Sequence, residues 1–391
     1  MSGDLISEKP MRHPTTALFL WAALASAASS AQTVPASQPS LTPAERWASI
    51  APFFSPPAEF AGQSGGYRPV LQFDDGTRVK TPQDWPRRRQ EIRAYWDAKL
   101  GAWPVLLEKP EVKFLAQEHV ENFTRSKIRI ELAAGLKRDA YLLVPDGPGK
   151  FPAVVSVFYT AEASANLDPK STKVVFGYDL AKRGFVTLCL GGVSDDVRKP
   201  QETPMQPLMF LAYVAANAHT ALAQMPQVDP RRIGIIGHSF GGKWAMFASC
   251  LYDKYAAAVW SDPGIVWNEA DSNANYWEPW YLGFEKGVTR KPGVVTESDP
   301  RTGAYKQLLA EHHDLNELHA LMAPRPFLVS GGAQDPPAHW VALNGSIALY
   351  KFLGYENRIA LTRREGHRPT PESREQAYEF FEHFLKDQPP D

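Results

Sequence analysis

The chain has 391 residues and a nearly balanced charge, with 42 Lys and Arg residues against 43 Asp and Glu residues. This balance gives no reason to expect nucleic acid or an anionic membrane as a partner. A hydrophobic fraction of 44% and a charged fraction of 22% are typical of a globular protein. Two cysteines, Cys189 and Cys250, are too few for a disulfide framework, and the sequence leaves open whether they pair.

Residues 1–31 are predicted to be a secretory signal peptide. Two basic residues precede an apolar run over 17–28, and Ser29 and Ala31 occupy the −3 and −1 positions of a cleavage site before Gln32. The run is too short to span a bilayer. The protein is therefore expected to be secreted or periplasmic.

Three parts of the chain are expected. After the signal peptide, residues 32–80 are predicted to be a linker and N-terminal extension, because Pro and Ser are frequent where they begin. Residues 81–391 are predicted to form a single domain. A charged helix is expected where this domain begins, over 81–101, and its Trp85, Ile92, Tyr95 and Trp96 could share an apolar face.

The later elements alternate between strands and helices. Two short segments, "SKIRIEL" and "KRDAYLLVPDG", predict paired antiparallel strands joined by the turn "AAGLK". Apolar strand-like runs and helical segments then follow one another to the end of the chain. This pattern predicts an α/β fold: a mostly parallel central sheet with helices on both faces and an N-terminal antiparallel edge. That is the layout of the α/β-hydrolase fold.

Ser239 is predicted to be a nucleophile. It lies in Gly237-His238-Ser239-Phe240-Gly241, which matches G-x-S-x-G, after the apolar run "RRIGIIG" and before the apolar helix "GGKWAMFASCLY". A five-residue match is weak by itself, but a strand before it and a helix after it are the context of a nucleophile elbow. A glycine-rich turn with an idle serine is the alternative.

His367 is predicted to be the base that takes the proton of Ser239. A serine hydroxyl needs such a base, and in this fold the order along the chain is Ser, acid, His. His367 follows the strand-like run "NRIALTRR" and precedes the last helix, "PESREQAYEFFEHFLK". His383 lies inside that helix, and His312, His313 and His319 are expected on a surface helix or loop. That histidine group lacks carboxylates at zinc-site spacing, so no metal is predicted.

Two aspartates compete for the role of the acid. Asp335 follows the run "RPFLVSGGAQ", and Asp262 ends the earlier run "YAAAVWSD". Either could orient the imidazole, and either could merely cap a turn. Asp335 is favoured and Asp262 is kept as the alternative. For the oxyanion, the expected donors are the backbone N–H of Phe240 and one from the loop around Tyr159 and Thr160.

With these residues in view, the chain resembles the glucuronoyl esterases, the 4-O-methyl-glucuronoyl methylesterase-like group of carbohydrate esterases within the α/β-hydrolase superfamily. The resemblance spans most of the chain after the signal peptide, as a divergent member. It rests on "DWPRRRQEI", "YDLAKRGF", "GHSFGGKWA", "NYWEPWYLGFE", "DLNELHALMAPRPFLVSGG" and "EGH".

The resemblance implies three substrate-binding residues and one departure. Lys243 matches a family lysine that contacts sugar hydroxyls, Trp280 is the nearest match to an aromatic residue near the site, and Glu269 corresponds to a glutamate that holds sugar hydroxyls. The family arginine that follows the serine and assists the oxyanion is Phe240 here.

The function expected from all of this is that of a secreted serine esterase. It would cleave carbohydrate-linked esters of the glucuronoyl type through a Ser-His-Asp acyl-enzyme mechanism, with a small-molecule or polysaccharide ester as its partner. The alternatives are an acetyl-xylan-type deacetylase, a prolyl-oligopeptidase-like peptidase on the same fold, or a noncatalytic protein whose Trp-rich segment binds sugars. No cofactor motif is found, and neither a nucleic acid nor a membrane span is expected.

Overall fold

The apolar runs of the sequence become the buried strands of one sheet. The structure is a computed structural model that describes residues 41–171, 173–192 and 205–388. Its strands lie in the order β1-β2-β3-β5-β4-β6-β7-β8-β9, and β4 to β9 run parallel to one another. The strands are β1 Val112–Val120, β2 Phe123–Ala133, β3 Leu136–Pro145, β4 Phe151–Val157, β5 Val186–Leu190, β6 Val228–His238, β7 Ala257–Ser261, β8 Phe327–Gly331 and β9 Ile359–Arg363. The prediction of a mostly parallel α/β sheet is confirmed.

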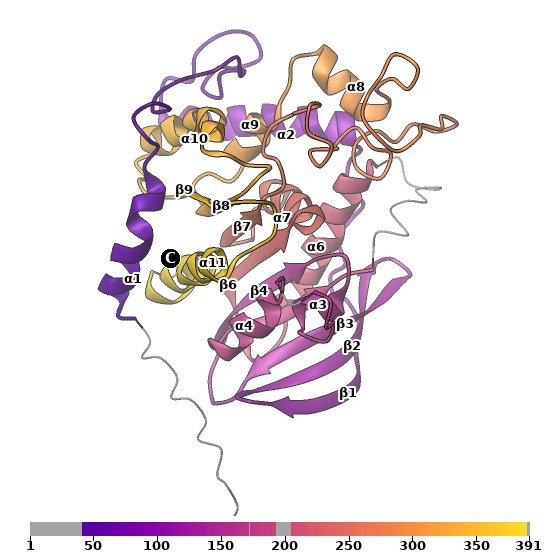
Figure 1. The fold of residues 1–391 in the computed structure, drawn as a ribbon, viewed down its shortest axis with the longest axis vertical. Helices are drawn as coiled ribbons and strands as arrows, with labels where there is room; N and C mark the ends of the chain where they lie inside the picture. The colour runs from indigo at the N-terminus through magenta and orange to yellow at the C-terminus, as the bar shows by residue number, and fades with distance from the viewer. Residues whose placement is uncertain (1–40, 172, 193–204, 389–391) are drawn as a thin grey trace, which may run out of the picture. The chain divides into compact units, whose positions relative to one another are not determined.

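The antiparallel edge has one more strand than the sequence predicts. β2 and β3 pair antiparallel, as expected, and β3 also pairs antiparallel with β5. β1, which pairs antiparallel with β2, has no counterpart among the predicted elements. It is exposed at nearly every residue, so it carries no alternation of buried and exposed positions that would mark a strand. Figure 1 shows this edge at the bottom of the view.

Helices cover both faces of the sheet. They are α1 Pro43–Ile50, α2 Trp85–Leu100, α3 Ala161–Ser164, α4 Phe176–Lys182, α6 Pro207–Ala223, α7 Phe240–Leu251, α8 Gly303–Ala310, α9 Leu315–Ala320, α10 Trp340–Phe352 and α11 Pro371–Glu382. Some of them are flanked by the short 3-10 helices η1 Ala51–Phe54, η2 Pro82–Asp84 and η3 Pro337–His339 and by the short π-helix η4 His383–Asp387. The expected helix over 81–101 is confirmed as η2 and α2, with Trp85, Ile92 and Trp96 buried.

Two cores lie on opposite faces of the parallel strands. Successive residues of a strand point to opposite faces, so Val155 and Ile235 pack in one core and Val154 and Ile236 in the other. The first core also contains side chains of α2, α6, α7, α9 and α10, whereas the second contains those of α1, α4 and α11. Cys189 of β5 and Cys250 of α7 are both buried and free, as small core residues.

Residues 41–80, the described part of the predicted N-terminal extension, belong to the same compact unit as the predicted domain that follows them. Ile50 and Phe54 are buried in the core that α11 also lines. Arg46 of α1 forms ion pairs with Glu382 and with Asp387. Residues 41–54 therefore complete one face of the sheet. The predicted signal peptide lies outside the described residues.

None of the helices in the described ranges is long and apolar enough to cross a membrane.

Candidate active site

Ser239 lies on a strained turn between β6 and α7. Its backbone has φ 56° and ψ −113°, a conformation that a residue with a side chain adopts only where its surroundings impose it. The glycines on either side make the turn possible. A Cβ on Gly237 would lie 2.1 Å from the carbonyl oxygen of Gly241, and a Cβ on Gly241 would lie 2.1 Å from that of Val157. The motif G-x-S-x-G is thus required by close backbone approach, as the sequence predicts.

His367 lies between Ser239 and an aspartate. Its Nε2 is 2.8 Å from the Oγ of Ser239, and its Nδ1 is 2.7 Å from Oδ2 of Asp262. Ser239 follows the last residue of β6, Asp262 follows the last residue of β7, and His367 lies in the loop after β9. Because β6, β7, β8 and β9 are parallel neighbours, the carboxyl ends of these strands meet at one edge of the sheet.

The acid beside His367 is Asp262, so the preference for Asp335 in that position is corrected. Asp335 is buried and accepts hydrogen bonds from the backbone N–H groups of Gly264 and Ile265, at 2.9 and 2.6 Å. Its remaining side-chain partner is His339, with 3.0 Å between Oδ1 and Nδ1. The loop after β8 turns back on itself before it reaches Asp335, whereas Asp262 follows β7 at once.

The two aspartates support each other's loops. Oδ1 of Asp262 accepts hydrogen bonds from the backbone N–H groups of Gln334 and Asp335, at 3.0 and 2.9 Å. Asp335 in turn binds the backbone two and three residues after Asp262. The carboxylate that faces His367 is thereby fixed in position, with Oδ2 left for the imidazole.

A buried arginine and a second histidine surround the Ser-His-Asp group. Arg364 lies 3.8 Å from Oδ2 of Asp262 and donates to the carbonyl oxygen of His367 at 2.8 Å. The ring of His238 lies 4.6 Å from that of His367, and burial lowers the pKa of His238 well below its usual value. His238 is therefore neutral at pH 7 and does not oppose a positive charge on His367. Arg364 is not among the residues predicted from the sequence, although it lies three residues before His367 in the same loop.

The two predicted oxyanion donors lie at the starts of two different helices, Phe240 at α7 and Thr160 at α3. Phe240 is the first residue of α7, where backbone N–H groups have no partner within the helix. Thr160 is exposed and its side chain caps α3, while the neighbouring Tyr159 lines the pocket at Ser239. The ring of Phe240 stacks on that of Tyr159, with 4.9 Å between centroids. An aromatic pair thus stands where the resemblance implies an arginine.

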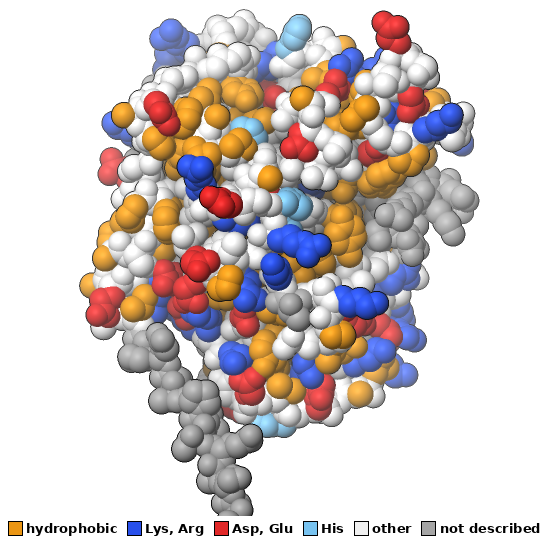
Figure 2. Space-filling model, in the orientation of Figure 1, with side chains coloured by type: hydrophobic (Ala, Val, Ile, Leu, Met, Phe, Trp, Pro, Cys, Tyr) orange, Lys and Arg blue, Asp and Glu red, His pale blue; other side chains and the backbone are white. Residues whose placement is uncertain are grey.

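The pocket over Ser239 has a volume of about 300 Å³. It is lined by Phe158, Tyr159, Lys170, Ser171, Lys173, Val174, His238, Ser239, His367, Arg368 and Pro369. The two lysines and the arginine of this lining were not singled out from the sequence. Figure 2 shows Lys and Arg side chains gathered near the middle of the face in view, beside hydrophobic side chains.

Lys243 does not reach over this pocket, which corrects the expectation from the resemblance. It is buried, and its Nζ donates to the carbonyl oxygens of Pro263 and Asn273 at 2.6 and 3.0 Å. The ammonium also lies 4.8 Å from the ring centre of Tyr276. Burial lowers the pKa of Lys243 to about 8. Lys243 therefore anchors the segment that follows Asp262 to helix α7 through these hydrogen bonds.

The other two residues implied by the resemblance lie in the irregular segment between β7 and α8. Trp280 is partly buried, and its ring centre is 6.2 Å from that of Tyr281. Glu269 is paired with Arg301. Neither Trp280 nor Glu269 belongs to the lining of the pocket at Ser239. The structure therefore does not bring them together with Ser239, His367 and Asp262.

The histidines expected on the surface are in part buried. His312 is exposed, but His313 and His319 are buried, and His313 is paired with Glu317. Within the ranges that the structure describes, no group of three or more His, Cys, Asp and Glu side chains could hold a metal ion.

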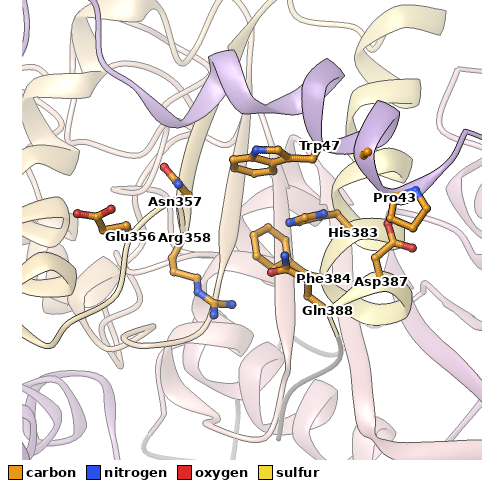
Figure 3. Close-up of a pocket in the computed structure, with 10 residues that line it drawn as sticks. Pro43, Trp47, Glu356, Asn357, Arg358, His383, Phe384, Asp387 and Gln388 are labelled. Atoms are coloured by element: carbon orange, nitrogen blue, oxygen red, sulfur yellow. The ribbon is translucent and has the colours of Figure 1, made fainter.

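A second pocket lies between α1 and the end of the chain. It has a volume of about 510 Å³, and its described lining residues include neither serine nor cysteine, so none of them is a nucleophile of the kind found at Ser239. Figure 3 shows Trp47 of α1 above His383 and Phe384; the rings of Trp47 and His383 are stacked with 5.0 Å between centroids. These contacts attach α1 to η4, and we assign this pocket to the packing of the fold.

Comparison with known proteins finds similarity to one protein family and to two esterases of known name. The prolyl oligopeptidase family matches residues 215–389. The 4-O-methyl-glucuronoyl methylesterase of Neurospora crassa is 23% identical over 310 residues, which cover 75% of this chain and 74% of the relative. The protein of the same name from Thermothelomyces thermophilus is 23% identical over 314 residues, with coverages of 75% and 73%.

Solved structures of esterases share the fold. A glucuronoyl esterase from Solibacter usitatus superposes with a TM-score of 0.63 at 19% identity, covering 81% of this chain and 97% of that one. A putative acetyl xylan esterase from Bacteroides fragilis gives 0.52 at 14% identity, with coverages of 75% and 79%. The curated relatives are carboxylic ester hydrolases, the class of enzyme that the sequence predicts. The expected resemblance is confirmed: the chain has the α/β-hydrolase fold and is similar to the glucuronoyl esterases.

Proposed function

We propose that the protein is a serine esterase that cleaves carbohydrate-linked esters of the glucuronoyl type through Ser239, His367 and Asp262. The observation that carries the proposal is the continuous hydrogen-bonded chain from the Oγ of Ser239 through His367 to Asp262, at 2.8 and 2.7 Å. Nucleophile, base and orienting acid are thus within reach of one another, and Ser239 and His367 line a pocket of about 300 Å³.

In the first half of the reaction, the Oγ of Ser239 attacks the ester carbonyl while Nε2 of His367 takes the hydroxyl proton. Asp262 holds Nδ1–H of His367 and stabilises the imidazolium that forms. The backbone N–H of Phe240, at the positive end of α7, donates to the oxyanion, and an N–H of the loop at Tyr159 and Thr160 is the proposed second donor. The C–O bond of the ester then breaks, and the alcohol leaves with the proton from His367.

In the second half, water attacks the acyl group on Ser239 and gives a proton to His367. The second tetrahedral intermediate collapses, the bond between the acyl carbon and the Oγ of Ser239 breaks, and His367 returns the proton to that oxygen. The acid leaves as the second product. Throughout the cycle, neutral His238 adds no positive charge next to the imidazolium.

The substrate class and the location of the protein are proposed from different observations. The names of the curated relatives support a methylglucuronoyl ester as the substrate class. The predicted signal peptide over 1–31 supports export, and an extracellular or periplasmic enzyme would have access to polysaccharides.

The test is hydrolysis of three esters by the purified protein and by Ser239→Ala. Benzyl glucuronate, acetylated xylan and p-nitrophenyl acetate separate a uronoyl esterase from a deacetylase and from a general esterase. We expect turnover of benzyl glucuronate that disappears in Ser239→Ala. Hydrolysis of acetylated xylan but not of benzyl glucuronate would still support the Ser-His-Asp mechanism. It would contradict the glucuronoyl substrate class and favour a deacetylase.

A peptidase is the second candidate, because the prolyl oligopeptidase family matches residues 215–389. The match covers the end of the chain, where β6 to β9 and all three residues of the Ser-His-Asp group lie. A proline-containing p-nitroanilide is the corresponding substrate, and its cleavage in a Ser239-dependent manner would favour this reading. A noncatalytic sugar-binding protein would bind xylan oligosaccharides and hydrolyse none of these compounds.

A further inference from the structure

Three cationic side chains line the pocket at the nucleophile. Lys170 and Lys173 come from the loop between α3 and α4, and Arg368 follows His367 in the loop after β9. All three are exposed, and within the described residues none of them forms an ion pair. Two loops far apart in the sequence thus place positive charge around Ser239.

No carboxylate among the described lining residues neutralises this charge. In the part of the lining that the structure describes, there is neither Asp nor Glu. The nearest acid along the chain to Lys170 is Asp168, which accepts hydrogen bonds from the hydroxyl of Ser171 and the backbone N–H of Lys170. These bonds, and to a smaller extent the charge of Lys170, lower the pKa of Asp168, but no ion pair forms between these two described side chains. Asp262 behind the pocket is bound to His367 and to the backbone of the loop after β8.

The positive lining is a local property of this pocket. The chain as a whole has a formal net charge of −1, so its average surface does not attract anions. A cleft lined by one sign of charge raises the local concentration of oppositely charged ligands and the rate at which they bind. A neutral ester would accept hydrogen bonds from these cations but gain no charge–charge attraction, whereas an ester with a separate anionic group would be attracted and oriented by them.

We propose that the natural substrate carries a carboxylate in addition to the scissile ester, and that Lys170, Lys173 and Arg368 bind it. This inference rests on the proposed esterase function. Because the uronic carboxyl of a glucuronoyl ester is itself esterified, the inference places an additional carboxylate elsewhere on the substrate. The carboxylate belongs either to the alcohol or to the acyl part of the substrate, and both positions place it near the lining of the pocket.

The test compares matched pairs of esters that differ only by a carboxylate and a carboxamide. On the alcohol side the pair is 4-carboxybenzyl acetate and 4-carbamoylbenzyl acetate; on the acyl side it is benzyl hydrogen succinate and benzyl succinamate. The readout is the ratio of kcat/KM within a pair. We expect a ratio of about ten or more for at least one pair at low ionic strength, which falls as NaCl rises to about 0.5 M.

The variant Lys170→Gln/Lys173→Gln/Arg368→Gln is expected to bring that ratio down towards one. Its matched control removes three exposed charges outside the pocket lining, in Lys113→Gln/Lys306→Gln/Lys351→Gln, and is expected to keep the ratio of the wild type. The pair in which the ratio is high identifies the side of the ester that carries the charge.

Three failures are distinguishable. Ser239-dependent hydrolysis of the carboxamides with a ratio of one or less in both pairs would overturn the anionic substrate and leave the esterase function standing. An equal loss of preference in the pocket variant and in its control would overturn the assignment to these three side chains. Absence of Ser239-dependent hydrolysis of every ester would overturn the proposed function and the inference together.

Discussion

Asp262 and Asp335 are bound to each other's loops: the carboxylate of Asp262 accepts from the backbone N–H of Asp335, and Asp335 accepts from Gly264 and Ile265. Both side chains are buried, so each carboxylate needs these donors to offset the loss of water. Only Asp262 also faces His367. The two carboxylates therefore have different roles. Asp262 contacts the base, and Asp335 positions the loop after β7 that carries Asp262.

Asp262→Asn is expected to lower kcat by about 10³- to 10⁴-fold, because the amide no longer fixes the tautomer of His367 or stabilises its charge. Asp335→Asn is expected to cost far less in kcat and more in stability, about 1–3 kcal/mol, since an amide offers a single acceptor to the two N–H groups that Asp335 binds. Steady-state kinetics and urea unfolding of both variants measure the difference. A larger loss of kcat in Asp335→Asn would reverse the assignment.

Ser239→Ala and His367→Ala are each expected to lower kcat by about 10³-fold or more, and the double variant little further, because the two side chains act as one unit. The measurement is kcat on p-nitrophenyl acetate, with far-UV circular dichroism to check the fold. Strictly additive losses would show that Ser239 and His367 do not cooperate.

Lys243→Met is expected to lower kcat/KM for benzyl glucuronate and for p-nitrophenyl acetate by similar factors, within about threefold of each other. The reason is that its ammonium binds the carbonyl oxygens of Pro263 and Asn273, in the segment that starts at Asp262. Lys306→Met, on the exposed surface of α8, is the control and should leave both values unchanged. A selective loss on the glucuronate would return Lys243 to a sugar-binding role.

The same lysine gives a pH dependence of stability. Burial lowers its pKa from the usual 10.5 to about 8 in the folded protein. Between these values the unfolded chain holds a proton that the folded chain has lost, so this group raises the free energy of unfolding as pH rises through that window, by up to about 3 kcal/mol. Urea unfolding of wild type and Lys243→Met at about pH 7.5 and pH 10 gives the difference. Parallel pH dependences in the two proteins would contradict the shift.

The sequence predicts those parts of the site that depend on local backbone geometry. The turn at Ser239 requires Gly237 and Gly241 whatever surrounds it, so the motif is readable from five residues. The choice between Asp262 and Asp335 is not local, because both follow parallel strands and only the path of each loop decides which carboxylate reaches His367.

The role of Ser239 follows from local backbone geometry, whereas the role of Lys243 depends on a distant segment of the chain. Lys243 lies one turn further along α7, but whether its ammonium meets solvent or protein depends on the segment over 262–273, which has no regular secondary structure. Strand β1 could not be predicted from the sequence for a related reason. Its hydrogen bonds to β2 define it as a strand, whereas its exposed side chains show no strand pattern.

The position of α1 bears on where the folding unit begins. Ile50 and Phe54 are buried against the side chains of α11, and Trp47 stacks on His383 near the end of the chain. A recombinant protein started at residue 81 would leave this apolar surface of α11 open to water and available for association with other molecules. Expression of the folded enzyme therefore calls for a start no later than Leu41.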